Sequence, residues 1–473
     1  MHWQIGVGLA IQVAALVLVF GRLGHAWLKH VGAFFIGAAV AYHGLNEILL
    51  LLFPDRNPYR RFVQRMYVDE FVLWVSIAIL VFTMAYLIAL GRRSEAPSAS
   101  TADRRRMIVG RVFDWRLMLI AAIPLMLLAL TGRGSLLVTT NGVQRLDFAA
   151  GLSLQFLLPA TVLASLGIVY RFGRRWLVPV LLFQSVLIVA LTAQRLQVLV
   201  AVGMLLYASA QLGIAIKPAH ALLLVAAFLG IGLVLTSARA AEGRIATTSG
   251  AELRLEFLTK GVANLGSGAT RSAVAADLGY RLDGNSFGAL ELQSLASGSQ
   301  PLGFTPLWND VLLAVPSFLN PDKNLSPVEV RNEKAYAETH LNLPLPPQYM
   351  LDPTGSRYVI RPGAHLDILT TQLGVTTGYW GPVGLLIVAA LLGTVFGIVD
   401  RWILRNLSPT RLLIGVGLLS CVLYYETSWE TYTITFRGIL LLLPLVWIVQ
   451  WLRTSSLPHE EPIPQLIDLA GPE

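Results

Sequence analysis

Three arginines in the middle of the sequence have the type and spacing of an anion-binding site. Arg195 lies in a short polar stretch between two long apolar runs, and Arg239 and Arg244 follow the end of the next apolar run. Because each run is predicted to cross a membrane once, the three side chains emerge on the same side of it. An arginine keeps its charge and offers a planar fork of N–H donors that matches phosphate. The pattern indicates a site for a lipid-linked anion, and its alternative is a set of ordinary interface anchors.

The composition indicates an integral membrane protein. Hydrophobic residues make up 55% of the 473 residues and charged residues only 14%, and the mean hydropathy is +0.62. Such a chain has too few ionisable side chains to cover the surface of a soluble globule of this length. The single cysteine, Cys421, lies in an apolar run, so we expect it to be packed and inert. The first apolar run lacks the basic start and the cleavage site of a signal peptide, so we expect it to be a membrane anchor.

Apolar runs of roughly the 20 residues that cross a bilayer recur along the chain. We expect an all-α integral membrane protein with about eleven transmembrane helices, at residues 3–20, 31–53, 71–91, 116–131, 148–170, 176–193, 197–214, 219–237, 382–399, 411–425 and 437–452. These runs divide the chain into transmembrane helices 1–8 over residues 1–237, a large loop over 238–378, transmembrane helices 9–11 over 379–453 and a disordered cytoplasmic tail over 454–473.

The arginines and lysines of the connections predict the orientation. The linker 92–116 carries seven arginines, which places it in the cytoplasm by the positive-inside rule. The connections 21–30, 171–175, 215–220 and 400–411 then fall on the same side, and all are basic. This orientation puts the N-terminus outside and the C-terminus in the cytoplasm. The outside connection 54–70 also carries four arginines, which the rule does not explain, so a miscounted helix remains an alternative.

The loop 238–378 lies on the outer side in this topology. It is long for a connection and lacks the alternation of a β-sandwich, so we expect an irregular, partly helical cap on the membrane. One apolar segment in it, 306–323, is bounded by prolines and too short to span, which indicates a re-entrant or interfacial segment.

Several function classes are disfavoured. The loop 238–378 holds eleven Lys and Arg against thirteen Asp and Glu, so the surplus positive charge lies in the cytoplasmic connections and does not indicate a nucleic-acid partner. We find no cluster of His, Cys and Asp with the spacing of metal ligands, and no glycine-rich phosphate loop. We therefore expect no metal site, no cofactor and no use of a nucleotide.

Two ionisable residues stand inside an apolar run. His43 and Glu47 are four residues apart, and so share a face of a helix. Because such groups are costly in lipid, we expect both to point into the protein, either in a structural hydrogen bond or in a site.

The order of these features resembles a known family. The hinge with Arg195, the large outside loop with the segment 315–323, and the stretch from His365 to Gly374 that runs into 378–384 together look like the O-antigen polymerases of the Wzy type and the related O-antigen ligases. The resemblance covers roughly residues 190–400. It implies a bacterial inner-membrane glycosyltransferase of GT-C-like architecture, acting at the periplasmic face on undecaprenyl-pyrophosphate-linked glycans as donor and acceptor. Membrane lipids, a chain-length regulator and a flippase are the partners it implies.

The resemblance also assigns roles. The departing pyrophosphate calls for cations, which we expect to be Arg195, Arg239 and Arg244 with Lys323, Arg331 and Arg361 from the cap. The attacking hydroxyl needs a base or an orienting group, for which His365 and Asp367 are the candidates. For sugar contacts at the outer end of the last helix pair we expect Glu426, Trp429, Glu430 and Tyr432, although aromatic residues there also form membrane belts.

Polymerisation of repeat units is the activity that we predict from these roles, without a metal ion. The alternatives are ligation of the glycan to lipid A-core, a transporter or flippase of lipid-linked glycans, and a non-catalytic scaffold. A transporter usually carries its charges at midplane, whereas the polar residues here collect at one outer face, which favours a transferase.

Overall fold

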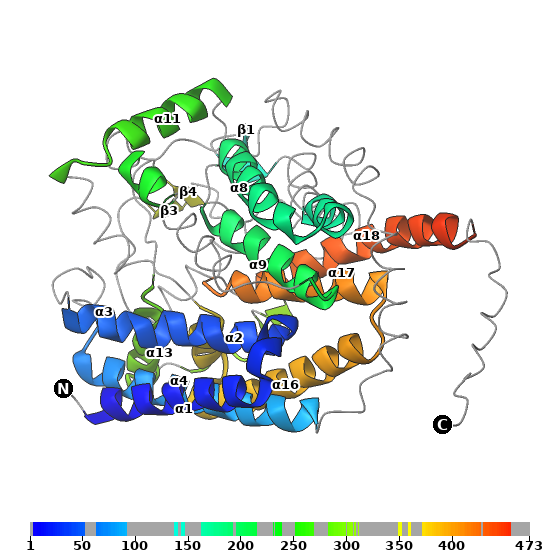
Figure 1. The fold of residues 1–473 in the computed structure, drawn as a ribbon. Coiled ribbons are helices and arrows are strands. Elements are labelled where there is room, and N and C mark those ends of the chain that lie inside the picture. The colour runs from blue at the N-terminus through cyan, green and yellow to red at the C-terminus, as the bar shows by residue number, and fades with distance from the viewer. Residues whose placement is uncertain are drawn as a thin grey trace, which may run out of the picture.

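The structure, a computed structural model, is mainly helical (Figure 1). It describes residues 3–52, 63–91, 137–140, 143–146, 162–192, 195–214, 230, 232–238, 251–268, 282–298, 300–305, 307–308, 311, 349–351, 358–360, 371–426 and 429–455.

Helices make up most of the described part of the first half of the chain. The first half of the chain contributes α1 (Trp3–Leu23), the 3-10 turn η1 (Gly24–Lys29), α2 (Val31–Val40), the π-helical turn η2 (Ala41–Leu45), α3 (Asn46–Leu52), α4 (Arg65–Leu90), the 3-10 turn η5 (Arg174–Trp176), α8 (Leu177–Thr192) and α9 (Arg195–Gln211). An apolar helix also covers Val162–Phe172.

The second half adds α11 (Ala251–Ala263), α13 (Asn285–Ala296), α16 (Gln372–Arg405), α17 (Pro409–Leu423) and α18 (Glu430–Ser455). Two short antiparallel hairpins accompany the helices, one of β1 (Leu137–Thr140) and β2 (Val143–Leu146), the other of β3 (Tyr349–Leu351) and β4 (Tyr358–Ile360). In Figure 1, α1, α2, α4 and α16 run roughly alongside one another, and α13 runs across their direction.

Four helical stretches among the described residues are long and apolar enough to cross a membrane: Trp3–Lys29, Val31–Leu50, Arg65–Leu90 and Gln372–Arg405. Shorter apolar helices cover Val162–Phe172, Leu177–Val186, Val198–Gln211 and Pro409–Leu423. The described part of the chain is thus mainly helical and contains several candidate membrane spans.

Most of the predicted apolar runs coincide with a described helix, but the helices have different ends. The run predicted at 382–399 is the middle of α16, which begins ten residues earlier at Gln372. The extra turns contain Thr376 and Thr377, which lower the apolar character of the sequence there but are buried inside the bundle. The predicted run 116–131 lies outside the described residues, as do the linker residues 92–116 and most of the tail.

Glycines bring α4 and α16 into close contact. A Cβ at Gly393 would overlap the backbone of Phe82, and a Cβ at Gly397 would stand 2.6 Å from the carbonyl oxygen of Tyr86. The two glycines are four residues apart, and so lie on one face of α16 and let the helix backbones approach. Beside this contact, the rings of Phe35, Phe82 and Phe396 pack together in the core.

Hydrogen bonds between helix ends define two ends of the bundle. At the first, which we call the Lys29 end, Gln211 Nε2 donates to Lys29 O at 2.8 Å, and Arg22 donates to Gly91 O at 2.8 Å. Arg401 lies beside Gly91 at the same end. These residues lie in or directly beside the connections 21–30, 92–116, 215–220 and 400–411, which we predicted from the sequence to share one side of a membrane.

The opposite end, which we call the His43 end, gathers the other connections. Gly284 N donates to Tyr42 O at 3.2 Å, and Gln372 N donates to Tyr425 O at 3.2 Å. Gln64 N, just before α4, donates to the side chain of Gln293 at 3.0 Å. The segments before α4, around α13, before α16 and after α17 therefore meet at the end of the bundle that lies away from Lys29.

Candidate functional site

The candidate site is a group of buried polar side chains at the His43 end. They come from η2, α3, the start of α13 and the segment after α17, which are far apart in the sequence. His43, Asn46, Glu47, Asp283 and Asn285 are all at most 4% exposed. The expectation that His43 and Glu47 point into the protein is confirmed.

Four of these side chains form a chain of hydrogen bonds, which we call the His43 network. Tyr425 Oη lies 2.9 Å from His43 Nε2, and His43 Nδ1 lies 2.7 Å from Asn285 Oδ1. Asn285 Nδ2 donates to Glu47 Oε1 at 2.6 Å and to the backbone oxygen of His43 at 2.9 Å.

The partners of Asn285 determine the tautomer of His43. Because Asn285 Nδ2 donates to two oxygens, the other side-chain atom of Asn285 is the carbonyl oxygen, which only accepts. His43 Nδ1 therefore carries the proton. In a neutral imidazole Nε2 is then an acceptor, and it receives the hydrogen bond of the Tyr425 hydroxyl. The hydrogen bonds between the four side chains thus run in one direction, from Tyr425 to the Glu47 carboxylate.

The π-helical turn η2 supplies the position of His43. One wider turn at Ala41–Leu45 changes the rotation between α2 and α3, and single turns of this kind are frequent at functional sites. It turns His43 and Glu47 toward α13 and leaves Gly44 against the side chain of Gln12 on α1.

Asp283 fixes the first turn of α13. Its Oδ1 accepts from the backbone N–H groups of Asn285 at 3.1 Å and Ser286 at 3.0 Å, and its Oδ2 accepts from the Ser286 hydroxyl. Asn46 Nδ2 donates to the same carboxylate at 3.1 Å. A carboxylate that accepts backbone donors at a helix start stabilises that helix, so Asp283 has a structural role in holding α13.

Close packing locks α13 between α4 and α16. A Cβ at Gly288 would overlap the ring of Phe71 on α4. On the other side, a Cβ at Gly378 of α16 would stand 2.6 Å from the carboxylate of Glu291, which is fully buried. The helix therefore carries an acid and an amide into the interior of the bundle.

A second layer of side chains joins α16 to the start of α18. Thr371 and Gln372 are fully buried, and Tyr432 Oη donates to Gln372 Oε1 at 2.9 Å. Trp429 Nε1 donates to Thr376 Oγ1 at 3.2 Å. The rings of Trp429 and Tyr432 lie 5.2 Å apart at their centroids. This layer adjoins the His43 network because Gln372 N donates to the backbone oxygen of Tyr425.

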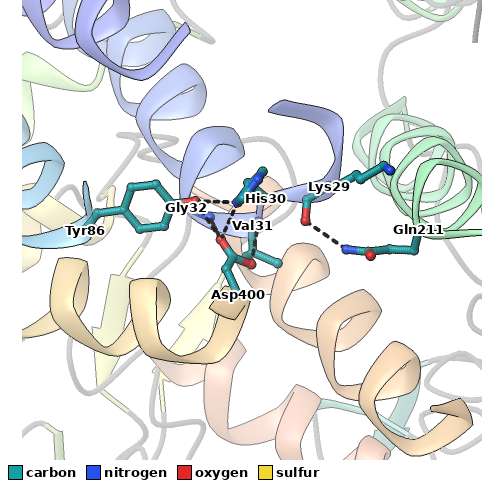
Figure 2. Close-up of polar contacts among 7 residues, drawn as sticks. All are labelled: Lys29, His30, Val31, Gly32, Tyr86, Gln211 and Asp400. Carbon is teal, nitrogen blue, oxygen red and sulfur yellow. Dashed lines mark hydrogen bonds and ion pairs between the residues drawn. The ribbon is translucent and has the colours of Figure 1, made fainter. Parts of the chain in front are cut away.

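A separate polar cluster lies at the Lys29 end and has a structural role (Figure 2). Asp400 accepts from the first backbone N–H groups of α2, those of Val31 at 3.0 Å and Gly32 at 3.1 Å. Tyr86 Oη donates to Asp400 Oδ2 at 2.9 Å and lies 2.9 Å from His30 Nδ1. Asp400 therefore meets the unpaired donors and the positive end of the α2 dipole, which ties α2 to α16.

The structure describes five of the predicted site residues. Arg195 is the first residue of α9, and the other end of α9, Gln211, contacts Lys29. Arg195 therefore lies toward the His43 end. Glu426 Oε2 accepts from Tyr42 Oη at 3.2 Å. Glu430 begins α18, Tyr432 is partly buried, and Trp429 is only 7% exposed, with its ring packed against neighbouring side chains.

The remaining predicted residues lie outside the described residues: Arg239, Arg244, Lys323, Arg331, Arg361, His365 and Asp367. The roles given to all twelve residues stay predictions.

Sequence reasoning did not single out Asn285, Tyr425 or Gln372. The signal for Asn285 was present in the sequence. Helix starts are often marked by Asp, Asn or Ser, and all three occur here, at Asp283, Asn285 and Ser286. Nothing in the sequence of Tyr425 or Gln372 distinguishes them from ordinary helix-end residues, since their contacts join distant segments.

No metal site is evident in the described part of the chain, where no group of three or more His, Cys, Asp and Glu side chains is placed to hold an ion. In comparisons with protein-family models, with curated proteins and with solved structures, no match to this chain was found.

Proposed function

We propose that this protein is a bacterial inner-membrane glycosyltransferase that polymerises undecaprenyl-pyrophosphate-linked oligosaccharide repeat units at the periplasmic face. It has about eleven transmembrane helices, and the loop 238–378 forms a GT-C-like cap at the His43 end. The observation that carries the proposal is α13, a helix of that loop, which inserts polar residues into this end of the bundle and meets His43 and Glu47 there.

The arrangement of arginines at the two ends of the bundle supports a reaction at the periplasmic face of the membrane. Arg22 and Arg401 gather at the Lys29 end, whereas the buried polar groups of the candidate site gather at the opposite end. Under the positive-inside rule, the Lys29 end faces the cytoplasm and the His43 end faces the periplasm.

The proposed reaction breaks the bond between the anomeric carbon of the donor glycan and the pyrophosphate oxygen. An acceptor hydroxyl forms the new glycosidic bond and gives its proton to a base, and undecaprenyl pyrophosphate leaves with the electron pair. Arg195, Arg239 and Arg244 bind the leaving pyrophosphate, which then needs no metal ion. The position of Arg195 at the start of α9, away from Lys29, is compatible with this role.

Chain connectivity supports His365 and Asp367 as the candidates for the base. Asp367 precedes Thr371 by four residues, and Thr371 is fully buried with its Cγ2 beside Gly284 in the candidate site. Four residues of extended chain span at most about 14 Å, and the six from His365 at most about 22 Å. Both residues are thus tethered within reach of the outer end of α16.

The His43 network positions the cap in this proposal. It holds the first turn of α13 against η2 and the end of α17, so that the loop and the membrane helices keep one arrangement around the substrate. A buried network whose side chains are hydrogen-bonded to one another rigidifies the surrounding structure.

One observation favours the second candidate, a transporter of lipid-linked glycans. His43 and Glu47 are buried within the candidate span Val31–Leu50, and buried ionisable groups in spans are common on transport pathways. Ligation of the glycan to lipid A-core is the close chemical competitor, because it uses the same donor.

Deletion of the gene and analysis of the glycan distinguishes the three. Loss of a polymerase leaves single repeats on lipid A-core, loss of a ligase leaves long chains on undecaprenyl pyrophosphate, and loss of a transporter leaves single lipid-linked repeats on the cytoplasmic side. Complementation then tests the site. We expect Arg195→Ala, Arg239→Ala and Asp367→Ala to abolish long chains, and Arg22→Ala, at the Lys29 end, to keep them. Long chains of normal length in all three stably expressed site variants would reject the assignment of the site.

A further inference from the structure

The helix α16 has a kink at its outer part, and a segment of the loop is attached to it. Gly381 has a φ of 71° and is followed by Pro382. In a regular helix the carbonyl oxygen of Gly378 would accept from residue 382, but proline has no N–H group.

The loop segment at Leu302 and Gly303 donates to two carbonyl oxygens of α16 at the kink, and one of them is the oxygen that lacks its helical donor. Leu302 N donates to Gly378 O at 3.2 Å, and Gly303 N donates to Tyr379 O at 2.8 Å. Next to this contact the ring of Phe304 packs on Trp380, with centroids 5.3 Å apart. The segment is therefore fixed to α16 at the kink by its backbone and by its side chains.

The distance along α16 gives the depth of the kink. Arg401 lies at the Lys29 end, next to Gly91. The nineteen residue-to-residue steps from Pro382 to Arg401 rise by about 29 Å in an α-helix, close to the roughly 30 Å of a bilayer's hydrocarbon core. If the Arg401 guanidinium marks one boundary of the hydrocarbon, the kink marks the other.

The face of α16 between these levels is suited to lipid. Exposed apolar side chains follow one stripe of the helix at Val383, Ile387, Leu391, Val395, Ile398 and Trp402. At its outer end the stripe continues into the loop segment, where Phe304 is 73% exposed and Trp308 is 61% exposed, and Val311 is exposed as well. Two large aromatic rings so exposed at the height of the hydrocarbon boundary are typical of a membrane belt.

We propose that Phe304, Trp308 and Val311 form a lipid-contact surface, which anchors this segment of the loop in the bilayer at the boundary between headgroups and hydrocarbon. The occupant is bulk bilayer lipid, because the surface continues the lipid-facing stripe of a candidate membrane span. The loop is then bound to the membrane at the kink of α16 and does not stand free in the aqueous phase. This inference is independent of the glycosyltransferase activity.

Nitroxide labels in liposomes test the proposal. The only cysteine, Cys421, is buried, so Cys421→Ala gives a background for single labels. Labels at Phe304→Cys and Trp308→Cys are compared with Val395→Cys, in the middle of the stripe, and Glu256→Cys, an exposed acid on α11. The liposomes contain phosphatidylcholine and phosphatidylglycerol, and collisions with oxygen and with a water-soluble nickel chelate are measured.

We expect the ratio of oxygen to nickel collisions at residues 304 and 308 to exceed that at residue 256 severalfold and to approach that at residue 395. A ratio equal to that at residue 256 would place the surface in water and overturn the proposal. Exclusion of both reagents would mean that protein covers it, which overturns the proposal equally. Val311→Cys keeps both aromatic rings and gives the same readout if the other two variants fail to fold.

Discussion

The Oδ1 atom of Asn285 accepts a hydrogen bond from His43 Nδ1 at 2.7 Å, and this contact connects a loop helix to a candidate membrane span. The two residues are 242 positions apart in the sequence. Asn285 is the first residue of α13, and the same side chain also donates to Glu47. One amide thus holds three elements together, and its substitution tests how much the candidate site depends on that connection.

Asn285→Asp should destabilise the protein more than Asn285→Ala. The aspartate would replace the donor to Glu47 by a second carboxylate at 2.6 Å in a fully buried place, whereas alanine only leaves partners unsatisfied. Leaving a buried group unpaired costs about 1–3 kcal/mol, and a buried like charge costs more. Thermal unfolding in detergent measures the effect. Asn264→Asp, directly after α11, where the amide is only partly buried and donates to Lys260 O, is the control and should change the midpoint little.

Tyr86 and Asp400 should be energetically coupled. Tyr86→Phe removes the hydroxyl that donates to Asp400, and Asp400→Asn keeps the size of the side chain but lowers its value as a cap of α2. Residues in one hydrogen-bonded network commonly couple by about 0.5–3 kcal/mol. A double-mutant cycle on the unfolding free energy measures this. Strictly additive effects would show that the Tyr86 hydroxyl does not stabilise the cap.

His30 should make the protein less stable in acid. It lies between two candidate spans, and burial, with a smaller effect of the Lys29 charge, lowers its pKa from 6.5 to about 4. Between these values the unfolded chain binds the proton and the folded chain does not, so stability rises with pH. The contribution of His30 is therefore complete above about pH 6.5 and is lost as the pH falls toward 4.

The comparison uses His30→Gln, which replaces the imidazole with an amide. The amide still forms hydrogen bonds but does not titrate. When the pH is lowered from about 7.5 to about 5, the midpoint temperature of unfolding should fall further for the unmodified protein than for the variant. All other titratable groups are shared, so the difference reports His30 together with its effect on the Asp400 carboxylate, 3.8 Å away. Equal losses in the two proteins would contradict the prediction.

The sequence was sufficient to predict the helical fold, because a run of twenty apolar residues has few other stable structures. It also predicted that His43 and Glu47 point inward, since a charge in lipid is costly and the spacing of four puts both on one face. It did not identify their partners. Asn285 and Tyr425 reach His43 through the packing of helices that are distant in the chain, and local patterns carry no information on such pairs. The start of α16 was missed because Thr376 and Thr377 interrupt its apolar pattern.

Gly397→Leu should disrupt the contact between α4 and α16. Even a Cβ at this position would lie 2.7 Å from the Cβ of Ala89, so a leucine requires the helices to separate. Overpacking of this kind costs about 1–3 kcal/mol or more. Gly37→Leu in α2 is the matched control, because a Cβ there has no neighbour within 4 Å. The fraction of monodisperse protein after extraction in detergent should fall for Gly397→Leu and stay unchanged for Gly37→Leu, and a similar fall in both would disprove the packing argument.

Pro382→Ala should loosen the attachment of the loop segment at the kink. The new backbone N–H at position 382 would compete with Leu302 for the carbonyl oxygen of Gly378, which Leu302 now holds at 3.2 Å. Loss of one such bond is worth about 1 kcal/mol, so amide hydrogen exchange at Leu302 should accelerate by roughly fivefold. Mass spectrometry of peptides that cover residues 300–305 measures this exchange. Pro409→Ala is the control, because Pro409 stands in the first turn of α17. A backbone N–H there has no carbonyl acceptor within the helix, so the new N–H would not compete with Leu302 for an acceptor. Unchanged exchange at Leu302 in Pro382→Ala would mean that the side-chain packing of Phe304 on Trp380 holds the segment without help from the hydrogen bond.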